Sequence, residues 1–389
     1  MSLNLDRSAW KHVAFGDVVR NANVNVRDPE SAGIDRVIAM EHLDGGELKV
    51  NRWGSLEDGT TFTRRVTPRQ TLFGKRRAYQ RKVAYAEFDA VCSGDILTFE
   101  ADELQLLPEF LPFLVQSDRF FDHALGTSAG SLSPRTNWRD LSTFEFDLPP
   151  LEEQRRIADL LWAVETMARA QADQRQAIAC GRQVWLDGRV SDLVEAKKVN
   201  FSDVWSESPQ SGYSAAPVDE ATGRYVLSLA ALGPDGYRPG HLKNVPDTDK
   251  IRAATLRRGD LLVSRANTVD AVGRVGIYSE EREDVSFPDT MMRLNLKSQV
   301  LPKFAAAVIS SSHGRAHMRR SAAGSATSMV KINRTSLGRL PFPVVTLEDQ
   351  RALLKELSLF DSALDSTEAD AGAFRVLRGI LLAEIFGGK

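Results

Sequence analysis

Guanidinium and amide side chains gather in two short stretches of this 389-residue sequence. The first stretch reads Lys75-Arg-Arg-Ala-Tyr-Gln-Arg-Lys82, and the second reads Ser264-Arg-Ala-Asn-Thr268, with Arg274 close behind. An arginine can donate two hydrogen bonds to a guanine edge, and an asparagine or glutamine can pair in the same way with adenine. The two stretches therefore indicate surfaces for a polyanion, and their mixture of forked and amide groups favours nucleic acid.

The candidate nucleic-acid contacts fall into two chemical groups. Base-reading or base-adjacent groups are expected among Arg76, Arg77, Tyr79, Gln80, Arg265 and Asn267. Phosphate contacts, which position a protein without reading sequence, are expected from Arg64, Arg65, Lys82, Arg257, Arg258, Lys331 and Arg334. The same surfaces are expected to include Lys75, Ser264, Thr268, Arg274 and Asn333. The alternative for each of these residues is an ordinary solvated surface side chain.

The charge pattern supports polyanion-facing surfaces, although the formal net charge is −2. Residues 61–82 hold eight Lys or Arg and no Asp or Glu, and residues 290–347 hold nine Lys or Arg and no acid. Two such runs on a slightly acidic chain are typical of nucleic-acid binding, whereas one run by itself can be a solvated face. Gly-Ser loops at Gly130 and Gly324 offer backbone amides that can approach a phosphate, with a plain turn as the alternative.

Motifs for catalysis are missing from the sequence. It contains neither a phosphate-binding loop for ATP nor a dinucleotide fingerprint. The stretch Asp147-Leu-Pro-Pro150 departs from the catalytic loop of amino-methyltransferases, since Leu148 intervenes and Leu151 is not aromatic, so we expect a turn before a helix. His313 and His317 stand four residues apart without a nearby Glu or Cys partner, which favours a packing or phosphate-facing pair over a metal site. We expect no catalytic residue, no metal site and no cofactor.

The elements that position these residues come from a duplication of nearly half the chain. Residues 11–18 recur as 197–204, at an offset of 186. Residues 107–110 (Leu-Pro-Glu-Phe) recur as 301–304 at an offset of 194, and the Leu-Glu-Glu-Gln of 151–154 recurs as Leu-Glu-Asp-Gln at an offset of 196. The offset grows in order along the chain, whereas chance matches would scatter. The sequence therefore predicts two similar domains.

Each copy opens with a region of short predicted strands between Gly, Asp and Pro turns. These strands are 36–40, 90–92 and 95–99 in the first copy, and 225–229, 260–264 and 274–278 in the second. A strand that contains proline closes each copy, at 144–150 and 340–343. The pattern predicts mixed α/β (α+β) domains. Residues 72–77 correspond to the Leu262–Arg265 region at an offset of 190, so the two candidate loops occupy equivalent places.

A long helix is predicted after each strand-rich region. The first begins at Leu151, where Glu152 and Glu153 suit the positive helix end, and meets no Pro or Gly before Gly181. Heptad spacing places apolar residues at Ile157, Leu161, Val164, Ala168, Ile178 and Trp185 of the first helix. In the second helix the heptad residues are Leu353, Leu357, Phe360, Leu364, Thr367, Ala371, Phe374, Leu381 and Ile385. One such helix after each copy favours an antiparallel pair, and about 37 residues span about 55 Å, long enough to separate two globules.

These observations predict four segments and a cytoplasmic setting. The segments are a first domain (1–150), a helix (151–190), a second domain (191–346) and a C-terminal helix (347–389). No apolar stretch approaches the ~20 residues of a membrane span, and residues 1–12 lack the apolar region of a signal peptide. Two cysteines cannot form a disulfide framework, and Cys92, in an apolar strand, is expected to be buried and inert.

The duplicated helix-start motif carries a resemblance to a known family. Residues 148–158 (Leu-Pro-Pro-Leu-Glu-Glu-Gln-Arg-Arg-Ile-Ala) resemble the DNA-specificity subunits of type I restriction–modification systems. Further similarity lies in the weaker copy at 340–354, in 258–265, in 273–276, and in Ala323-Gly-Ser325 followed by Lys331-Ile-Asn-Arg334. The resemblance covers essentially the whole chain. The second motif departs from the pattern as Leu-Pro-Phe-Pro-Val-Val-Thr, so helix start and partner contact are expected to differ between the halves.

The resemblance implies a non-catalytic DNA-reading subunit. Its two target-recognition domains would each read one half of a bipartite site in double-stranded DNA, with the paired helices as an antiparallel coiled-coil spacer. It would recruit two modification subunits, which bind S-adenosylmethionine and methylate adenine, and through them ATP-dependent restriction subunits that translocate and cleave DNA. Two alternatives stay open: a self-contained DNA methyltransferase or nuclease, and an interaction scaffold whose basic runs bind an acidic protein.

Overall fold

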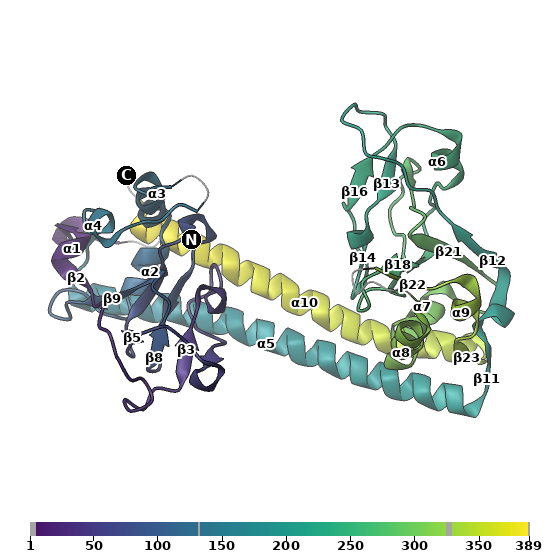
Figure 1. The fold of residues 1–389 in the computed structure, drawn as a ribbon, viewed down its shortest axis with the longest axis horizontal. Coiled ribbons are helices and arrows are strands. Elements are labelled where there is room, and N and C mark those ends of the chain that lie inside the picture. The colour runs from purple at the N-terminus through teal and green to yellow at the C-terminus, as the bar shows by residue number, and fades with distance from the viewer. Residues whose placement is uncertain (1–4, 131–132, 324–328, 388–389) are drawn as a thin grey trace. The chain divides into compact units, whose positions relative to one another are not determined.

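Two compact units make up the protein in the computed structural model, which describes residues 5–130, 133–323 and 329–387 (Figure 1). The first unit comprises Met1–Ala172 and Glu368–Lys389, and the second comprises Asp173–Thr367. Each unit holds one mixed α/β domain and one stretch of each long helix. The units therefore divide both helices near their middle, whereas the sequence predicted whole helices as separate segments.

The first unit is built on two four-stranded sheets. The sheets have the strand orders β2-β9-β6-β7 and β4-β3-β8-β5, and a third pairing joins β1 to β10. The strands are β1 (Lys11–Ala14), β2 (Val19–Asn21), β3 (Arg36–Ile38), β4 (Gly54–Ser55), β5 (Arg64–Val66), β6 (Thr71–Gly74), β7 (Val83–Tyr85), β8 (Ala90–Cys92), β9 (Ile96–Ala101) and β10 (Glu145–Leu148). The short helices are α1 (Phe15–Val18), α2 (Leu111–Gln116), α3 (Asp118–Gly126) and α4 (Trp138–Leu141).

The second unit repeats this plan with small additions. Its main sheets have the orders β12-β21-β17-β19 and β16-β13-β20, and β11 pairs with β23. The strands are β11 (Lys198–Asn200), β12 (Trp205–Ser211), β13 (Tyr225–Leu227), β14 (Leu232–Gly233), β15 (Gly236–Tyr237), β16 (Leu242–Asn244), β17 (Leu261–Ser264), β18 (Ala266–Asn267), β19 (Val275–Ile277), β20 (Val285–Ser286), β21 (Met291–Leu296), β22 (Val330–Lys331) and β23 (Pro341–Pro343). The short helices are α6 (Asp249–Ala253), α7 (Pro302–Ser310), α8 (Ser312–Ser321) and α9 (Arg334–Gly338).

Strand register confirms the predicted duplication. Leu72 of β6 lies opposite Thr98 and Ala84, and Leu262 of β17 lies opposite Arg293 and Gly276 in the same antiparallel arrangement. The parallel pair of β3 with β8 recurs as β13 with β20. The six strands predicted within the two regions and the two proline-containing strands are all present, although several are shorter than expected. The offset of 190 between the candidate loops is therefore a structural equivalence.

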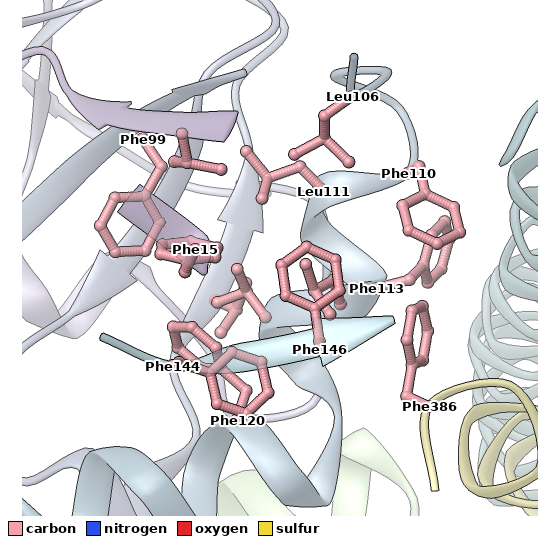
Figure 2. Close-up of a cluster of buried hydrophobic side chains, with 14 of the residues drawn as sticks. Phe15, Phe99, Leu106, Phe110, Leu111, Phe113, Phe120, Phe144, Phe146 and Phe386 are labelled. Atoms are coloured by element: carbon pink, nitrogen blue, oxygen red, sulfur yellow. The ribbon is translucent and has the colours of Figure 1, made fainter. Parts of the chain in front are cut away.

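Aromatic side chains dominate the core of the first unit, where sheet, short helices and long helices meet. Phe15, Phe99 and Phe120 pack ring against ring inside the domain, and Phe386 of the C-terminal helix contacts Phe110 with ring centroids 5.3 Å apart (Figure 2). In the second unit Phe201, Phe304 and Phe342 form the corresponding cluster. Aromatic rings bury a large apolar area each and dominate the energetics of a core. Since each unit has its own cluster of such rings, each domain has a core of its own.

The two long helices are α5 (Leu151–Ala196) and α10 (Leu347–Phe386). The helix expected over 151–190 thus continues to Ala196. In the second unit Arg182 pairs with Asp361 at 2.7 Å while Trp185, further along α5, contacts Phe360, so the helices run antiparallel as predicted. The heptad residues of both helices are buried or half-buried. In the first unit the nearly buried Glu165 accepts a hydrogen bond from Arg378 of α10.

A buried glutamine amide joins each domain to the start of its long helix. Gln154 is 0% exposed; its Oε1 accepts from the Leu107 amide, and its Nε2 donates to the carbonyls of Gln105 and Pro149, all at 2.8 Å. Gln350, 1% exposed, makes the same contacts with the backbone of residues 301, 299 and 345. The repeated Leu-Glu-x-Gln motif therefore marks a structural joint, in which one buried side chain bonds to three backbone groups.

We expect Gln154→Ala to destabilise the first unit, because it leaves one buried and two part-buried backbone groups without the partner that they have in the fold. At roughly 1–3 kcal/mol for each group, partly relieved by relaxation, the free energy of unfolding should fall by about 3 kcal/mol. For a unit of this size the melting temperature should fall by about 6–12 °C, which differential scanning calorimetry measures. Gln176→Ala, at an exposed position of the same helix, is the matched control. A Gln154→Ala chain that melts with the wild type would contradict this role.

Candidate nucleic-acid interface

In the first unit, the loop after β6 holds its polar side chains outward through a strained backbone. Arg77 and Arg81 adopt left-handed conformations (φ 56° and 52°) on either side of the 3₁₀ turn η4 (Ala78–Gln80). Ala78 is buried under the loop, while Tyr79 is 56% exposed and Gln80 is exposed. Such conformations cost about 1–2 kcal/mol for each residue that has a Cβ, and they concentrate at functional sites. The loop is thus built to present Arg77, Tyr79 and Gln80 to solvent.

A second segment, residues 133–136, crosses beside this loop. The Arg77 amide donates to the Pro134 carbonyl at 2.8 Å, and the Thr136 amide donates to the Lys75 carbonyl at 3.0 Å. Arg135 lies between these contacts, paired in β-bridges with Arg76 and with Ala129. The sequence analysis missed Arg135. The repeat could have identified it, because Arg135 corresponds to the predicted contact Lys331 at an offset of 196.

Charges in the first unit's loop are partly compensated inside the fold. The carboxylate of Asp95 pairs with two arginines: its Oδ1 lies 3.2 Å from Nε of Arg135, and its Oδ2 lies 3.8 Å from Nη1 of Arg76. Burial, together with the charges of Arg64 and Arg135, holds the pKa of the Lys75 ammonium below its ordinary value of 10.5, against the opposing effect of Asp95. Cations crowded in this way repel one another, and an anionic ligand would relieve that repulsion.

Three predicted phosphate contacts in the first unit are engaged internally. Arg64 donates to the carbonyls of Ile96 and Gly94, Arg65 pairs with Asp89 at 2.9 Å, and Lys82 donates to the Met40 carbonyl at 2.6 Å. All three side chains are half-buried. Because their donors already hold neighbouring strands and loops together, we leave them out of the interface.

The second unit builds an equivalent surface at the end of β17. There β18 pairs with β22, placing Ala266 opposite Lys331 and Asn267 opposite Val330, and the Ile332 amide donates to the Arg265 carbonyl at 2.9 Å. A bridge of Lys331 with Ala323 matches that of Arg135 with Ala129. Both domains therefore place a segment that carries a cation across the loop after the same strand.

Side chains of the second surface are held by short local contacts. Asn267 Nδ2 donates to Oγ of the buried Ser264 at 3.3 Å, and its Oδ1 accepts from the Thr268 amide at 2.9 Å. Arg274 lies alongside, because the Ser264 amide donates to its carbonyl at 2.7 Å. The structure thus brings together Arg265, Asn267, Thr268, Arg274 and Lys331. Ser264 supports them from below.

Other predicted contacts lie apart or serve as caps. Arg257 and Arg258 precede β17, one strand length or about 13 Å from Arg265, and Arg258 pairs with Glu281. Asn333 caps α9 by accepting from the Ser336 amide at 2.8 Å, which leaves Arg334 exposed at the first position of that helix. In the first unit, Gly130 has φ 112° and so fits a tight turn.

The predicted loop at Gly324 lies outside the described residues.

The two histidines that stand four residues apart are engaged with the backbone. His313 and His317 each bond to a backbone carbonyl, of Pro341 at 2.9 Å and of Ser336 at 2.8 Å, and no cluster of three or more potential metal ligands occurs in the described ranges. Burial raises the pKa of Cys92 to about 12, which keeps it in the unreactive thiol form. Across the same ranges, no helix is long and apolar enough to cross a bilayer.

Comparison with known proteins points in one direction. A family model described as the type I restriction modification DNA specificity domain matches residues 41–178. The chain is 27% identical to the EcoKI specificity subunit of Escherichia coli K12 over 214 residues, which cover 48% of this chain and 45% of that protein. It is 25% identical to the StySPI specificity subunit of Salmonella potsdam, over 82% of this chain and 72% of the relative. The EcoKI match therefore spans about half the length of that relative.

Solved structures share the fold. A chain from a structure titled as the complex assembly and conformational transition of the type I R-M system aligns with a TM-score of 0.59 at 18% identity, covering 98% of both chains. The specificity subunit of M. genitalium aligns with a TM-score of 0.53 at 14% identity over the full length of both.

We expect Arg135→Gln to raise the pKa of Lys75, because it removes a nearby like charge and frees Asp95. A lysine whose pKa is lowered in the fold makes stability rise with pH between its folded pKa and 10.5, so this rise should also shrink in the variant. The titration of Lys75 can be followed by NMR after ¹³C-methylation of the lysines. Arg139→Gln, at an exposed position of α4, should leave the pKa of Lys75 unchanged. An unchanged pKa in the Arg135 variant would refute the crowding of charges.

Proposed function

We propose that this chain, which belongs to the family of type I restriction–modification DNA specificity proteins, binds double-stranded DNA and reads its sequence without catalysing a reaction. One observation carries the proposal: both domains place the same loop, with forked or amide side chains, beside a crossing segment with a cation. Two surfaces of the same chemistry suit a ligand that offers the same kind of surface twice, as duplex DNA does at the two halves of a split site.

Within each surface, some side chains are suited to reading bases and others to binding phosphates. Arg76, Arg77 and Gln80 in the first unit, and Arg265 and Asn267 in the second, carry the side chains that can distinguish guanine or adenine in the major groove. Tyr79 adds an exposed ring that can pack against a base or sugar. The flanking cations, Lys75 and Arg135 in the first unit and Arg274, Lys331 and Arg334 in the second, are suited to phosphates. Affinity would then fall steeply with salt, because each neutralised phosphate releases a counterion.

Two domains joined by paired helices suggest a bipartite target. Each domain would read one short stretch of duplex, and the antiparallel helices would set the length of unread DNA between the stretches. Within the first unit, buried heptad residues and the Glu165–Arg378 hydrogen bond hold the two helices together. Helices paired in this way along their length would act as a spacer of fixed length.

The internal repeat also supports two copies of one protein partner. Val376 and Ile380 of α10 in the first unit are more than half exposed, and the same offset of 196 places Cys180 and Val184 of α5, both exposed, at the equivalent sites of the second unit. A pair of exposed apolar side chains that recurs under the repeat suits two identical modification subunits. Those subunits would bring S-adenosylmethionine and adenine methylation, and restriction subunits would join through them. The complex would act in the cytoplasm.

Mapping of methylated adenines across a genome tests the function. The full chain is co-expressed with its candidate modification subunits, and we expect methylation at one motif with two specified stretches separated by unspecified bases. One unbroken motif would contradict bipartite reading. Methyl transfer by the purified chain alone would favour the self-contained enzyme, and equal binding to unrelated DNA and heparin would favour the scaffold.

Substitutions in the two loops should act on different halves of that motif. Arg77→Ala should relax discrimination at one position of one half, and Asn267→Ala at one position of the other, by about 10–100-fold or 1–3 kcal/mol. Binding to duplex libraries with one half randomised measures both effects. Arg139→Ala, on exposed α4, should change neither. Uniform weakening on every sequence would show that these side chains touch phosphates and read no base.

A further inference from the structure

Two arginines of α8 meet Arg274 at the edge of the second unit's surface. Arg315 crosses from α8 to the turn before β19, where it donates to the carbonyls of Val272 at 2.7 Å and Asp270 at 2.9 Å. Arg319 follows four residues later on the same face of the helix and is exposed. Since Arg274 directly follows this turn, three guanidinium groups converge beside the loop that carries Arg265 and Asn267.

Close packing at Gly273 fixes this convergence. Gly273 has φ 74°, and a Cβ there would lie 2.5 Å from Met318 Cγ and 3.3 Å from Arg315 Nη1. Met318 itself is buried. The turn therefore lies directly against α8, and Arg315 is held in place by backbone carbonyls rather than by an acid.

The first unit neutralises the same place internally. By strand register Gly273 corresponds to Arg81, and by the helix offset Arg315 corresponds to Phe121. Arg81 lies over the Phe121 ring at 4.6 Å and pairs with Asp118 at 2.6 Å. Both units thus bring a guanidinium to this position from different elements, and among the described residues an ion-paired carboxylate is present for it only in the first unit.

The contrast extends across the two surfaces. In the first unit Arg76 and Arg135 share Asp95, and Arg81 has Asp118. Within the part of the chain that the structure describes, no ion pair joins an acid to five cations at or beside the second unit's loop, which are Arg265, Arg274, Arg315, Arg319 and Lys331. Uncompensated cations are costly to hold together unless a polyanion binds them.

We propose that Arg274, Arg315 and Arg319 form a phosphate-binding site in the second unit, which takes a phosphodiester of the DNA backbone beside the base-reading loop. The inference rests on the proposed function and adds an asymmetry to it. Arg315 is pre-oriented by its two carbonyl contacts, while Arg274 and Arg319 supply guanidinium donors that pair with no acid of the described residues. The second unit then contributes more of the salt-dependent affinity than the first, in which Arg76, Arg81 and Arg135 already pair with acids.

Electrostatics in the free protein agree with this assignment. Burial lowers the pKa of the Arg315 guanidinium, and the neighbouring charges of Arg319 and Arg274 lower it further, against a weaker opposing effect of Asp270. A bound phosphate would reverse the repulsion between the three arginines. The cluster is therefore primed for an anion.

The test compares two adjacent arginines of α8. Arg319→Gln removes a charge from the cluster, whereas Arg320→Gln removes the same charge from the next, exposed position, about 100° further round the helix. The full chain, purified with its modification subunits, is titrated with a duplex that carries the mapped motif at several salt concentrations. We expect Arg319→Gln to reduce the slope of log K against log salt by about 1 and to weaken binding several-fold. Arg320→Gln should keep the wild-type slope.

Arg274→Gln should reduce the slope as Arg319→Gln does. The proposal is overturned by a wild-type slope in either variant, or by an equal loss in Arg320→Gln. A scrambled duplex distinguishes the phosphate site from sequence reading, since phosphate contacts do not depend on sequence. If the wild-type protein binds both duplexes equally, it does not read sequence. The slopes of log K against log salt in the variants would still test the phosphate site. Absence of salt-dependent binding to either duplex would overturn both.

Discussion

The buried amide at the start of each long helix is the constraint on which the rest of the structure depends. Gln154 and Gln350 are buried, each bonds to three backbone groups, and each ties its domain's Leu-Pro loop to the helix. An unsatisfied group at such a place costs several times what an exposed bond contributes. The joint therefore sets where each domain begins on its helix, and the loops that face a ligand inherit their placement from it.

The two domains keep the same backbone plan, but equivalent positions receive their arginine side chains from different elements. Arg81 over Phe121 in the first unit becomes Arg315 beside Gly273 in the second. The same exchange occurs in the outer sheets, where Arg36 over Phe88 is replaced by Arg282 over Tyr225 at equivalent strand ends. Cation–aromatic contacts tolerate such exchange because the interaction does not depend on which strand supplies the charge. Surface chemistry can thus diverge while both cores and both joints stay alike.

The chain resembles type I DNA specificity subunits, and its internal repeat places one candidate loop in each domain. The offset along the sequence located both loops, since residues that follow equivalent strands must emerge at the same sheet edge. The same repeat relates Arg135 to Lys331, at an offset of 196. The engagement of Arg64, Arg65 and Lys82 was invisible to it, because their partners are carbonyls and an acid 24 to 42 residues distant in sequence.

The amino-acid sequence alone determined the duplication, the strand-rich domains, the two antiparallel heptad helices and the position of the candidate loops, because these depend on local periodicity and on order along the chain. Only the tertiary structure decided which cations are free. Pairing depends on side chains that meet across strands and helices, so Asp95 and Asp118 form ion pairs with cations of one surface, while in the described residues the cations of the other surface form no ion pair with an acid. Charge composition is a property of sequence, whereas charge compensation is a property of distance.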